Sequence, residues 1–229
     1  MLKFIQSSSI AIILSTYSIF AGPKMEIESK TINCGDIIEG TATKVPAVFT
    51  VKNTGDAPLK LTTVKPSCGC TVVKFDSTIQ AGKSTKIESA VNIPGYRSGH
   101  YTKQITVKSN VDDSTTRLAI EFTILPAIEI SDHAVDFDSS TINNGKIITL
   151  STKKVDLKVT SVQYTADTTA IPMKFNLIKT DSLTASGLHV FKLALFNPPK
   201  AKKGVGRIRI ALNHENKSEI SITGNVHIE

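Results

Sequence analysis

The sequence predicts an all-β protein in which two β-sandwich domains stand in tandem after an N-terminal signal peptide. Valine, isoleucine and threonine are abundant and tryptophan is absent, and β-branched residues favour strands. No stretch of about 12 residues keeps the apolar period of a helix. Short segments that alternate apolar and polar residues recur along the chain between turn residues, which is the pattern of half-buried strands.

The first 21 residues have the layout of a secretory signal peptide. Lys3 supplies a positive charge, a mostly apolar run follows, and small residues around Ala21 provide a cleavage site. The run is diluted by Gln6 and serines, so it is short for a span of about 20 apolar residues, although an uncleaved anchor is an alternative. No later segment is apolar enough to span a membrane. We therefore expect an exported mature chain beginning at Gly22, either periplasmic or secreted.

Residues 22–126 are expected to form the first domain. Its alternating segments predict seven strands, at 25–33, 44–53, 59–65, 71–75, 84–93, 100–109 and 115–125. About seven short strands joined by such turns are typical of an immunoglobulin-like sandwich. The buried tryptophan and inter-sheet disulfide that often accompany this fold are not present in that form, so the prediction depends on the strand pattern.

The stretch 48–71 concentrates the distinctive residues of this domain. Asn53-Thr54-Gly55-Asp56 is a turn signal between two alternating segments. Pro66 ends the second segment because proline lacks a backbone donor. Cys68-Gly69-Cys70 follows, and the glycine permits a tight backbone path. Both thiols are therefore expected on a tight loop at the end of a strand.

The segments NTGDAPL and SCGCT resemble the bacterial domain of unknown function numbered 1573, whose members are similar to the immunoglobulin-like ASH/Hydin domains. The resemblance extends over roughly residues 27–124 and includes the turn at 79–82 and the segments 99–103 and 105–110. It implies an exported, non-catalytic, immunoglobulin-like domain. Since no activity is settled for such a family, the resemblance does not supply the function.

Residues 127–229 are expected to form a second immunoglobulin-like sandwich, with the boundary at Leu125-Pro126-Ala127. Strands are predicted at 127–130, 146–151, 157–164, 173–179, 188–196, 205–212 and 219–227. An internal echo supports a repeat, since 105–110 with 118–120 resembles 208–213 with 220–222. In both places a strand ends at asparagine, a polar turn intervenes and an alternating strand follows. A repeat of about 100 residues fits tandem sandwiches, because solenoid repeats are about 20 to 50 residues long.

Three cysteines, Cys34, Cys68 and Cys70, allow three interpretations. The first is a structural disulfide from Cys34 to Cys68 or Cys70, since cysteines of exported proteins usually pair. The second is a strained, reducible disulfide between Cys68 and Cys70. The third is a soft-metal site for Cu(I) or Zn, in which Cys34 completes a three-sulfur set. Any thiol function would belong to the first domain.

Charge and motifs argue against nucleic-acid binding and against catalysis. The 27 basic and 20 acidic residues are interleaved along the predicted strands, as on ordinary solvated faces. One basic cluster, Lys200, Lys202 and Lys203 with Arg207 and Arg209 beyond, is interpreted as a solvated loop that leads into a strand. The sequence contains no nucleophile-elbow or P-loop motif and no H-E-x-x-H. A Cys70–His100 nucleophile lacks a third, orienting group, so we expect a non-enzyme that needs no cofactor.

Two functional hypotheses follow. The first is an exported, non-catalytic β-sandwich protein that binds a protein or cell-envelope partner or acts as a scaffold there, for example by strand addition at a sheet edge. The alternative is handling of Cu(I), another soft metal or redox equivalents through the loop of Cys68, Gly69 and Cys70.

Overall fold

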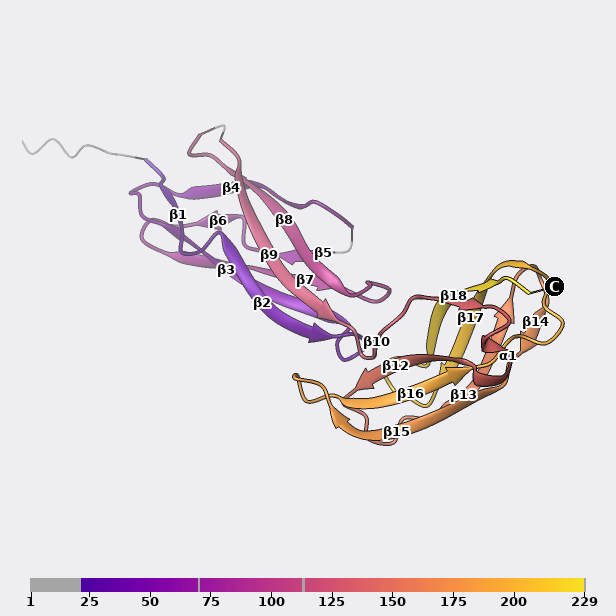
Figure 1. Cartoon of the computed structure of the whole chain (residues 1–229). Helices are drawn as coiled ribbons and strands as arrows, with labels where there is room; N and C mark the ends of the chain where they lie inside the picture. Colours follow the sequence, from indigo (N-terminus) through magenta and orange to yellow (C-terminus); the bar gives the residue numbers. More distant parts are fainter. Residues whose placement is uncertain (1–21, 70, 113, 229) are drawn as a thin grey trace, which may run out of the picture.

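The computed structural model describes residues 22–69, 71–112 and 114–228, and the predicted signal peptide lies outside these residues. The described chain forms two β-sandwiches placed end to end (Figure 1). Each sandwich has its own apolar core, one built from residues 45–124 and the other from residues 128–226. The prediction of an all-β protein with two tandem immunoglobulin-like sandwiches is confirmed.

The first sandwich consists of two sheets with the strand orders β1-β3-β7-β5 and β2-β9-β8-β4-β6. Strand β2 runs parallel to β9, and the other pairs are antiparallel. The bounds are β1 (Met25–Ile27), β2 (Thr31–Ile38), β3 (Lys44–Asn53), β4 (Leu59–Pro66), β5 (Thr71–Lys74), β6 (Thr78–Ile79), β7 (Ser84–Asn92), β8 (Gly99–Ser109) and β9 (Thr116–Leu125).

Alternation along the strands builds this core. In β3, Val45, Ala47, Phe49 and Val51 are buried, whereas the residues between them are more exposed. Successive side chains of a strand point to opposite faces, so every second residue enters the core. The single strand expected at 25–33 is wrong: β1 and β2 belong to different sheets, because the chain crosses from one sheet to the other between them.

The turn predicted at Asn53–Asp56 is organised by the buried side chain of Asn53. Its Nδ2 donates to the carbonyl oxygens of Ala57 and Ile79, at 2.8 and 3.0 Å. Its Oδ1 accepts from the backbone N–H groups of Gly55 and Lys24, at 3.0 and 3.3 Å. A buried amide needs such partners, and here it ties the turn to β1 and β6.

The sheets of the second sandwich have the orders β10-β12-β16-β15 and β11-β18-β17-β13-β14. They repeat the strand order of the first sandwich except at one edge of each sheet: β5, which follows β4, lies in the opposite sheet, whereas β14, which follows β13, stays in the same sheet. Strand β11 runs parallel to β18, as β2 does to β9. The bounds are β10 (Glu129–Ile130), β11 (Ala134–Phe137), α1 (Thr141–Asn144), β12 (Lys146–Thr152), β13 (Val159–Thr165), β14 (Ala170–Pro172), β15 (Phe175–Leu183), β16 (His189–Leu195), β17 (Gly204–Leu212) and β18 (Glu219–Val226). The short helix α1 and the strands β11 and β14 were not predicted.

Two asparagines explain the internal echo of the sequence. Asn110, after β8, accepts from the Lys60 N–H at 2.8 Å and donates to the Pro58 carbonyl at 3.2 Å through its side chain. Asn213, after β17, makes the same pair of bonds to Lys158 N–H at 2.7 Å and to the Asp156 carbonyl at 2.9 Å. The two sandwiches therefore share this detail as well as most of the strand order. In the described part of the chain, no helix has the length and apolar character needed to cross a membrane.

Candidate functional site

The Cys68 loop follows β4 and is attached to β8. The Ser67 N–H donates to the Gln104 carbonyl at 2.9 Å, and the Gln104 N–H donates to Ser67 Oγ at 3.3 Å. The Cys68 sulfur lies 3.7 Å from Thr71 Oγ1 and is disulfide-bonded. Cys70, the other predicted loop thiol, lies outside the described residues.

Cys34 is a half-buried free thiol on the edge strand β2. The register of β2 against β9 shifts between Asn33 and Asp36, so Cys34 sits in an irregular part of that strand. Its Sγ contacts the Pro46 carbonyl at 3.5 Å and packs against the core of the first sandwich. Burial raises the pKa of the Cys34 thiol, which disfavours the reactive thiolate.

Two predicted roles combine Cys34 with the cysteine loop, a disulfide and a three-sulfur metal site, and both are wrong. Strands β9 and β8 lie between β2 and β4. At about 4.8 Å per strand, this separation places Cys34 roughly 14 Å from the loop. A disulfide needs Cα atoms within about 7 Å, and two sulfur atoms that bind one metal ion at about 2.3 Å each lie within about 4.6 Å of each other. Cys34 therefore neither bridges to Cys68 or Cys70 nor completes a three-sulfur site for Cu(I) or Zn.

His100 does not approach the loop either. It starts β8, and its Nδ1 lies 3.3 Å from Thr123 Oγ1. Gln104, which contacts Ser67, is four positions further along β8, roughly 13 Å away at about 3.3 Å per residue. Among residues 22–69, 71–112 and 114–228, no group of three histidine, cysteine, aspartate or glutamate side chains is arranged to hold a metal ion.

A groove with a volume of about 1180 Å³ lies at the boundary of the two domains. The first domain contributes Glu39, Arg97 and Ser98 to its lining. The second domain contributes the outward face of β17 and β18, with the side chains of Val205, Arg207, Arg209, Glu219, Ser221 and Thr223. These side chains point outward because the residues between them, including Ile208, Ile210 and Ile222, fill the core.

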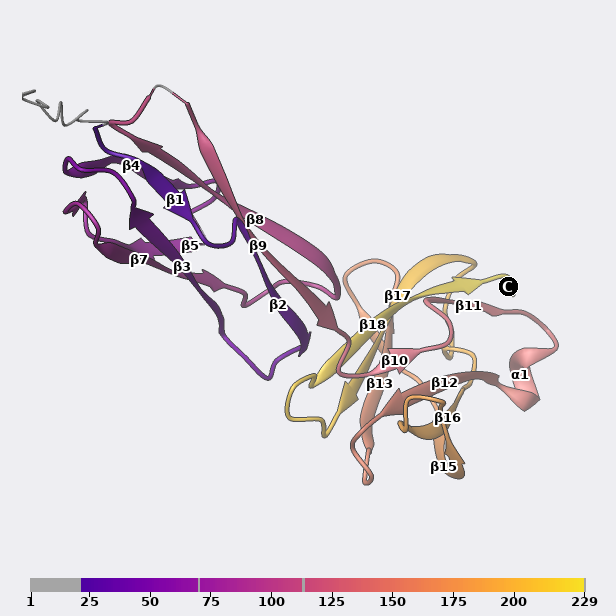
Figure 2. The ribbon, with the colours of Figure 1, turned by 90° about the vertical axis from the view of Figure 1, so that its left-hand side faces the viewer.

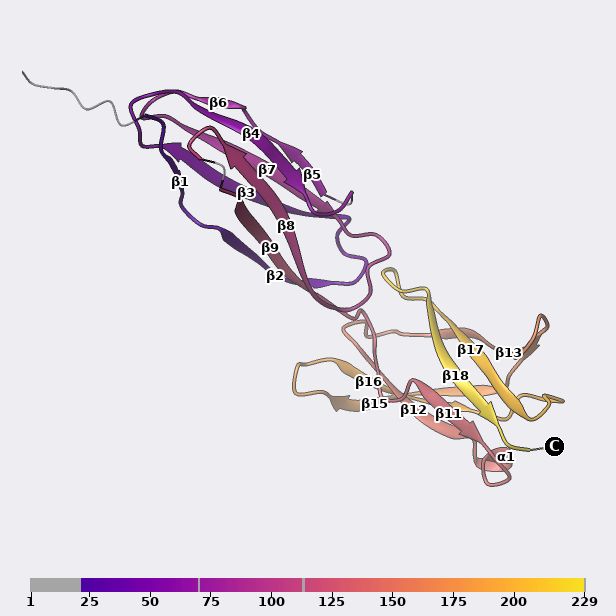
Figure 3. The same cartoon turned by 90° about the horizontal axis from the view of Figure 1, so that it is seen from above.

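The turn between β17 and β18 connects this sheet to the first domain. Figures 2 and 3 show the turn facing the end of β2. Gly40, after β2, has φ +81°, and a Cβ there would lie 2.7 Å from the Asn216 carbonyl oxygen. Only a glycine allows both this backbone angle and this close approach. Beside it, the Lys217 ammonium pairs with the Glu39 carboxylate at 2.5 Å.

His214 holds the same turn against the linker between the domains. It is buried, and its Nδ1 accepts from the Asn216 N–H at 3.2 Å. Its Nε2 lies 3.1 Å from Thr152 Oγ1, which donates to the Ala127 carbonyl at 3.0 Å. Since the hydroxyl proton of Thr152 is used for Ala127, the His214 proton belongs on Nε2. A chain of hydrogen bonds thus runs from the interdomain linker to the turn that contacts Gly40.

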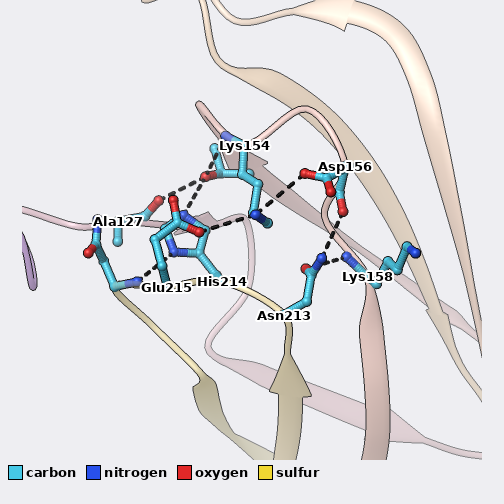
Figure 4. A network of polar contacts seen from close by, with 9 residues as sticks. Ala127, Lys154, Asp156, Lys158, Asn213, His214 and Glu215 are labelled. Atoms are coloured by element: carbon cyan, nitrogen blue, oxygen red, sulfur yellow. Dashed lines mark hydrogen bonds and ion pairs between the residues drawn. The ribbon is translucent and has the colours of Figure 1, made fainter.

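The ammonium group of Lys154, which is partly shielded from solvent, lies beside this chain of hydrogen bonds. Lys154 reaches between Glu215 and Asp156, with its Nζ 3.1 and 3.4 Å from their carboxylates (Figure 4). The hydrogen bond to Glu215 is the main reason that the pKa of Lys154 is raised. The pKa of Glu215 is lowered, first by a backbone hydrogen bond and then by the bond from Lys154. These residues were not predicted as a site, because they come from two separate loops of the second domain.

The groove and its junction contain none of the predicted cysteines. Arg207 and Arg209 had been interpreted as solvated strand residues. The two arginines are two positions apart in an alternating strand, and this spacing predicts that both side chains lie on the same face of the sheet. That the face lines a groove depends on the first domain, which no local pattern reveals.

Comparison with solved structures finds distant likenesses. A protein of unknown function from Porphyromonas gingivalis W83 is 12% identical, covers 89% of this chain and 99% of its own, and has a TM-score of 0.35. The ASH/PapD-like domain of human CEP192 is 12% identical over 55% of this chain and 99% of its own, with a TM-score of 0.35. The Vibrio cholerae VesB protease is 21% identical, but the match spans 43% of this chain and 31% of that protein, with a TM-score of 0.35.

No curated protein matches the chain significantly. Residues 25–124 match the family described as Protein of unknown function (DUF1573). The matched segment contains the buried Asn53 turn and the Cys68 loop, the two features that carried the resemblance in the sequence. The first sandwich is therefore a DUF1573 domain.

Proposed function

We propose that the protein is an exported, non-catalytic module that binds a protein partner of the cell envelope in the groove between its two sandwiches. The observation that carries this proposal is the junction. The groove is lined by both domains, and the Gly40–Asn216 contact and the Glu39–Lys217 pair hold its walls together. A recognition surface gains affinity when its parts are held in place before binding.

The size and openness of the groove favour a peptide segment over a small cofactor. Pockets for small molecules are typically about 300 to 1,000 Å³, and this groove is larger, at about 1180 Å³. Its floor is a sheet face covered by polar side chains. Such a surface suits polar contacts with a chain laid across it. Export is supported by the layout of residues 1–21, and the absence of catalytic motifs in the sequence supports a binding role.

The alternative, soft-metal binding by the cysteine loop, is not favoured. A metal-binding sulfur must be a thiolate, whereas the Cys68 sulfur is engaged in a disulfide. Cys34, the third candidate ligand, lies across two intervening strands.

Site-specific photo-crosslinking in cells of the native host tests the binding role. A photoreactive amino acid replaces Ser221 on the groove floor, and the control carries it at Lys86, an exposed residue of β7. We expect a discrete protein adduct from position 221 and none from position 86. Equal adducts at both positions, or none at 221, would contradict the proposal. Cell fractionation and N-terminal sequencing of the same samples test export and cleavage before Gly22.

A further inference from the structure

Two arginines dominate the floor of the interdomain groove. Arg207 and Arg209 lie on the outward face of β17, and both are exposed. The residues paired with Arg207 across the sheet are Thr165 and Thr223, and those paired with Arg209 are Gln163 and Ser221. All four neighbours are uncharged, with hydroxyl or amide groups. The four residues paired directly with the two arginines are therefore neutral and able to hydrogen-bond, while the carboxylates of Glu219 and Asp167 line the same groove farther along.

No described carboxylate forms an ion pair with either of these two guanidinium groups. In the described part of the chain, the ion pairs involve Lys154, Lys217 and His227, and none involves Arg207 or Arg209. Guanidinium groups are suited to planar, bidentate pairing with carboxylates. Two such groups on one side of a strand also repel each other. An anionic ligand laid over the groove would relieve this repulsion and fill both sites.

The distance between the two arginines along β17 indicates the kind of ligand. Residues two apart on a strand are separated by roughly 6.8 Å. An extended peptide has the same rise per residue, so carboxylates at alternate positions of such a peptide match the two arginines in register. The flanking hydroxyl and amide groups of Thr223, Ser221 and Gln163 can then hydrogen-bond to the polar groups between those carboxylates.

The rim of the groove argues against a polyanion such as nucleic acid. Glu129, Asp167 and Glu219 also line the groove, and they repel phosphates that extend beyond the two arginines. Nucleic-acid surfaces gather many basic residues because each neutralised phosphate releases counterions. A segment with only two acidic residues and neutral flanks places fewer negative charges beside these carboxylates.

We propose that Arg207 and Arg209 recognise an extended segment of a partner protein with acidic residues at alternate positions, held in the interdomain groove. This inference rests on the proposed binding function and specifies the chemistry of the partner. It also assigns a role to residues that sequence reasoning placed with the solvated Lys200–Lys203 cluster.

The test uses the mature chain and a fluorescent heptapeptide, Ser-Thr-Glu-Thr-Glu-Thr-Ser, with blocked ends. Its companion has glutamine in place of both glutamates. Anisotropy at low salt is expected to show binding of the acidic peptide and at least about tenfold weaker binding of the glutamine peptide, because two charge-assisted pairs are lost. Added salt should weaken the binding of the acidic peptide.

A matched pair of variants locates the interaction. Arg207→Gln with Arg209→Gln is expected to weaken binding of the acidic peptide at least about tenfold. Lys202→Gln with Lys203→Gln removes the same charge outside the groove lining, and it should leave binding within about twofold, since exposed charges at a distance contribute little. Circular dichroism and urea unfolding confirm that both variants are folded.

Three results would overturn the inference: equal binding of the two peptides, unchanged binding by the arginine variant, or an equal loss in both variants. The last would indicate a general charge attraction. If the inference fails while the adduct at position 221 persists, the binding function stands and the acidic specificity falls. If the adduct is also absent, the binding function itself is contradicted.

Discussion

Lys217 and Glu39 are 178 residues apart in the chain, yet the ammonium group of Lys217 contacts the carboxylate of Glu39 across the domain boundary. The pair is partly screened from solvent, and Gly40 and Asn216 touch beside it. A half-exposed ion pair of this kind contributes about 0–1 kcal/mol. The close backbone approach at Gly40 is therefore the stronger determinant of how the two domains meet.

Replacing Gly40 by alanine should alter the domain arrangement. The new Cβ would lie 2.7 Å from the Asn216 carbonyl oxygen, so the turn must move away. Gly82→Ala is the matched control, since Gly82 also has positive φ, +70°, but open space around it. Both variants should lose about 1–2 kcal/mol through backbone strain. Only Gly40→Ala should change the small-angle X-ray scattering profile, and a change in both or in neither would contradict the role of the contact.

Removing the hydroxyl group of Tyr164 should not destabilise the second domain. The side chain is fully buried, and in the described structure its Oη has no hydrogen-bond partner. Burial is the main reason that the pKa of Tyr164 is raised, with a smaller effect from Asp167. Tyr164→Phe keeps the ring and removes an unsatisfied group, so the free energy of unfolding should stay the same or rise by about 1 kcal/mol.

Gly206→Ala is the contrasting variant for the same pocket. Its Cβ would lie 2.5 Å from Tyr164 Cζ, so we expect a loss of about 1–3 kcal/mol from overpacking. Urea unfolding measures both variants. A loss of more than about 1 kcal/mol in Tyr164→Phe would show that the hydroxyl group has a favourable contact.

The second domain should lose stability in acid partly through Asp138. The Ser140 hydroxyl and then the Ser140 backbone N–H donate to this carboxylate and lower its pKa below the ordinary value of 3.8. A lowered pKa stabilises the fold above the ordinary value, and that contribution is lost as pH falls through the folded pKa. Calorimetry should therefore show that the melting temperature of the second domain decreases as the pH is lowered below about 4.

Asp138→Asn should make that fall shallower, since the amide oxygen still accepts hydrogen bonds but does not titrate. Part of the fall should remain, because hydrogen bonds from Asn225 and then His227 lower the pKa of Asp136 too. Asp181→Asn, on the exposed face of β15, removes the same charge and serves as the control. An unchanged slope in Asp138→Asn would be evidence against this role.

Cys34 should be the one cysteine that reacts without reduction. It is a free thiol, half-buried, with a raised pKa. Iodoacetamide should modify it slowly in the native protein and completely after denaturation, and peptide mapping should place the added mass on Cys34. Cys68 should react only after reduction, since it is disulfide-bonded. A peptide that links Cys34 to the loop would contradict the strand order that separates them.

Asn110 and Asn213 should have matching effects on their own domains. Each side chain bonds the chain at the start of the neighbouring strand, through Lys60 and Lys158 respectively. Alanine at either position removes two exposed side-chain hydrogen bonds, which should cost about 0.5–1.5 kcal/mol because water can replace the lost partner. In calorimetry, the variant at Asn110 should lower the melting temperature of the first domain, and the variant at Asn213 should lower that of the second. Asn176→Ala, at an exposed position of β15, serves as the control and should cost under about 0.5 kcal/mol.

The sequence by itself determined the fold class, the tandem repeat and the family of the first sandwich. These are local properties: alternation along β3 places every second side chain in the core, and Asn53 with Gly55 forms its turn through neighbours a few residues away. Such patterns are visible in a linear chain because strands and turns obey short periods.

Only the tertiary structure decided which distant residues meet. Cys34 and the Cys68 loop belong to one sheet, but the strand order β2-β9-β8-β4 keeps them apart. Alternation along β17 places Arg207 and Arg209 together on its outward face. The junction at Gly40 and Lys217 then makes that face the floor of a groove. Strand pairing between segments far apart in the chain depends on the packing of the whole domain, which no short period records.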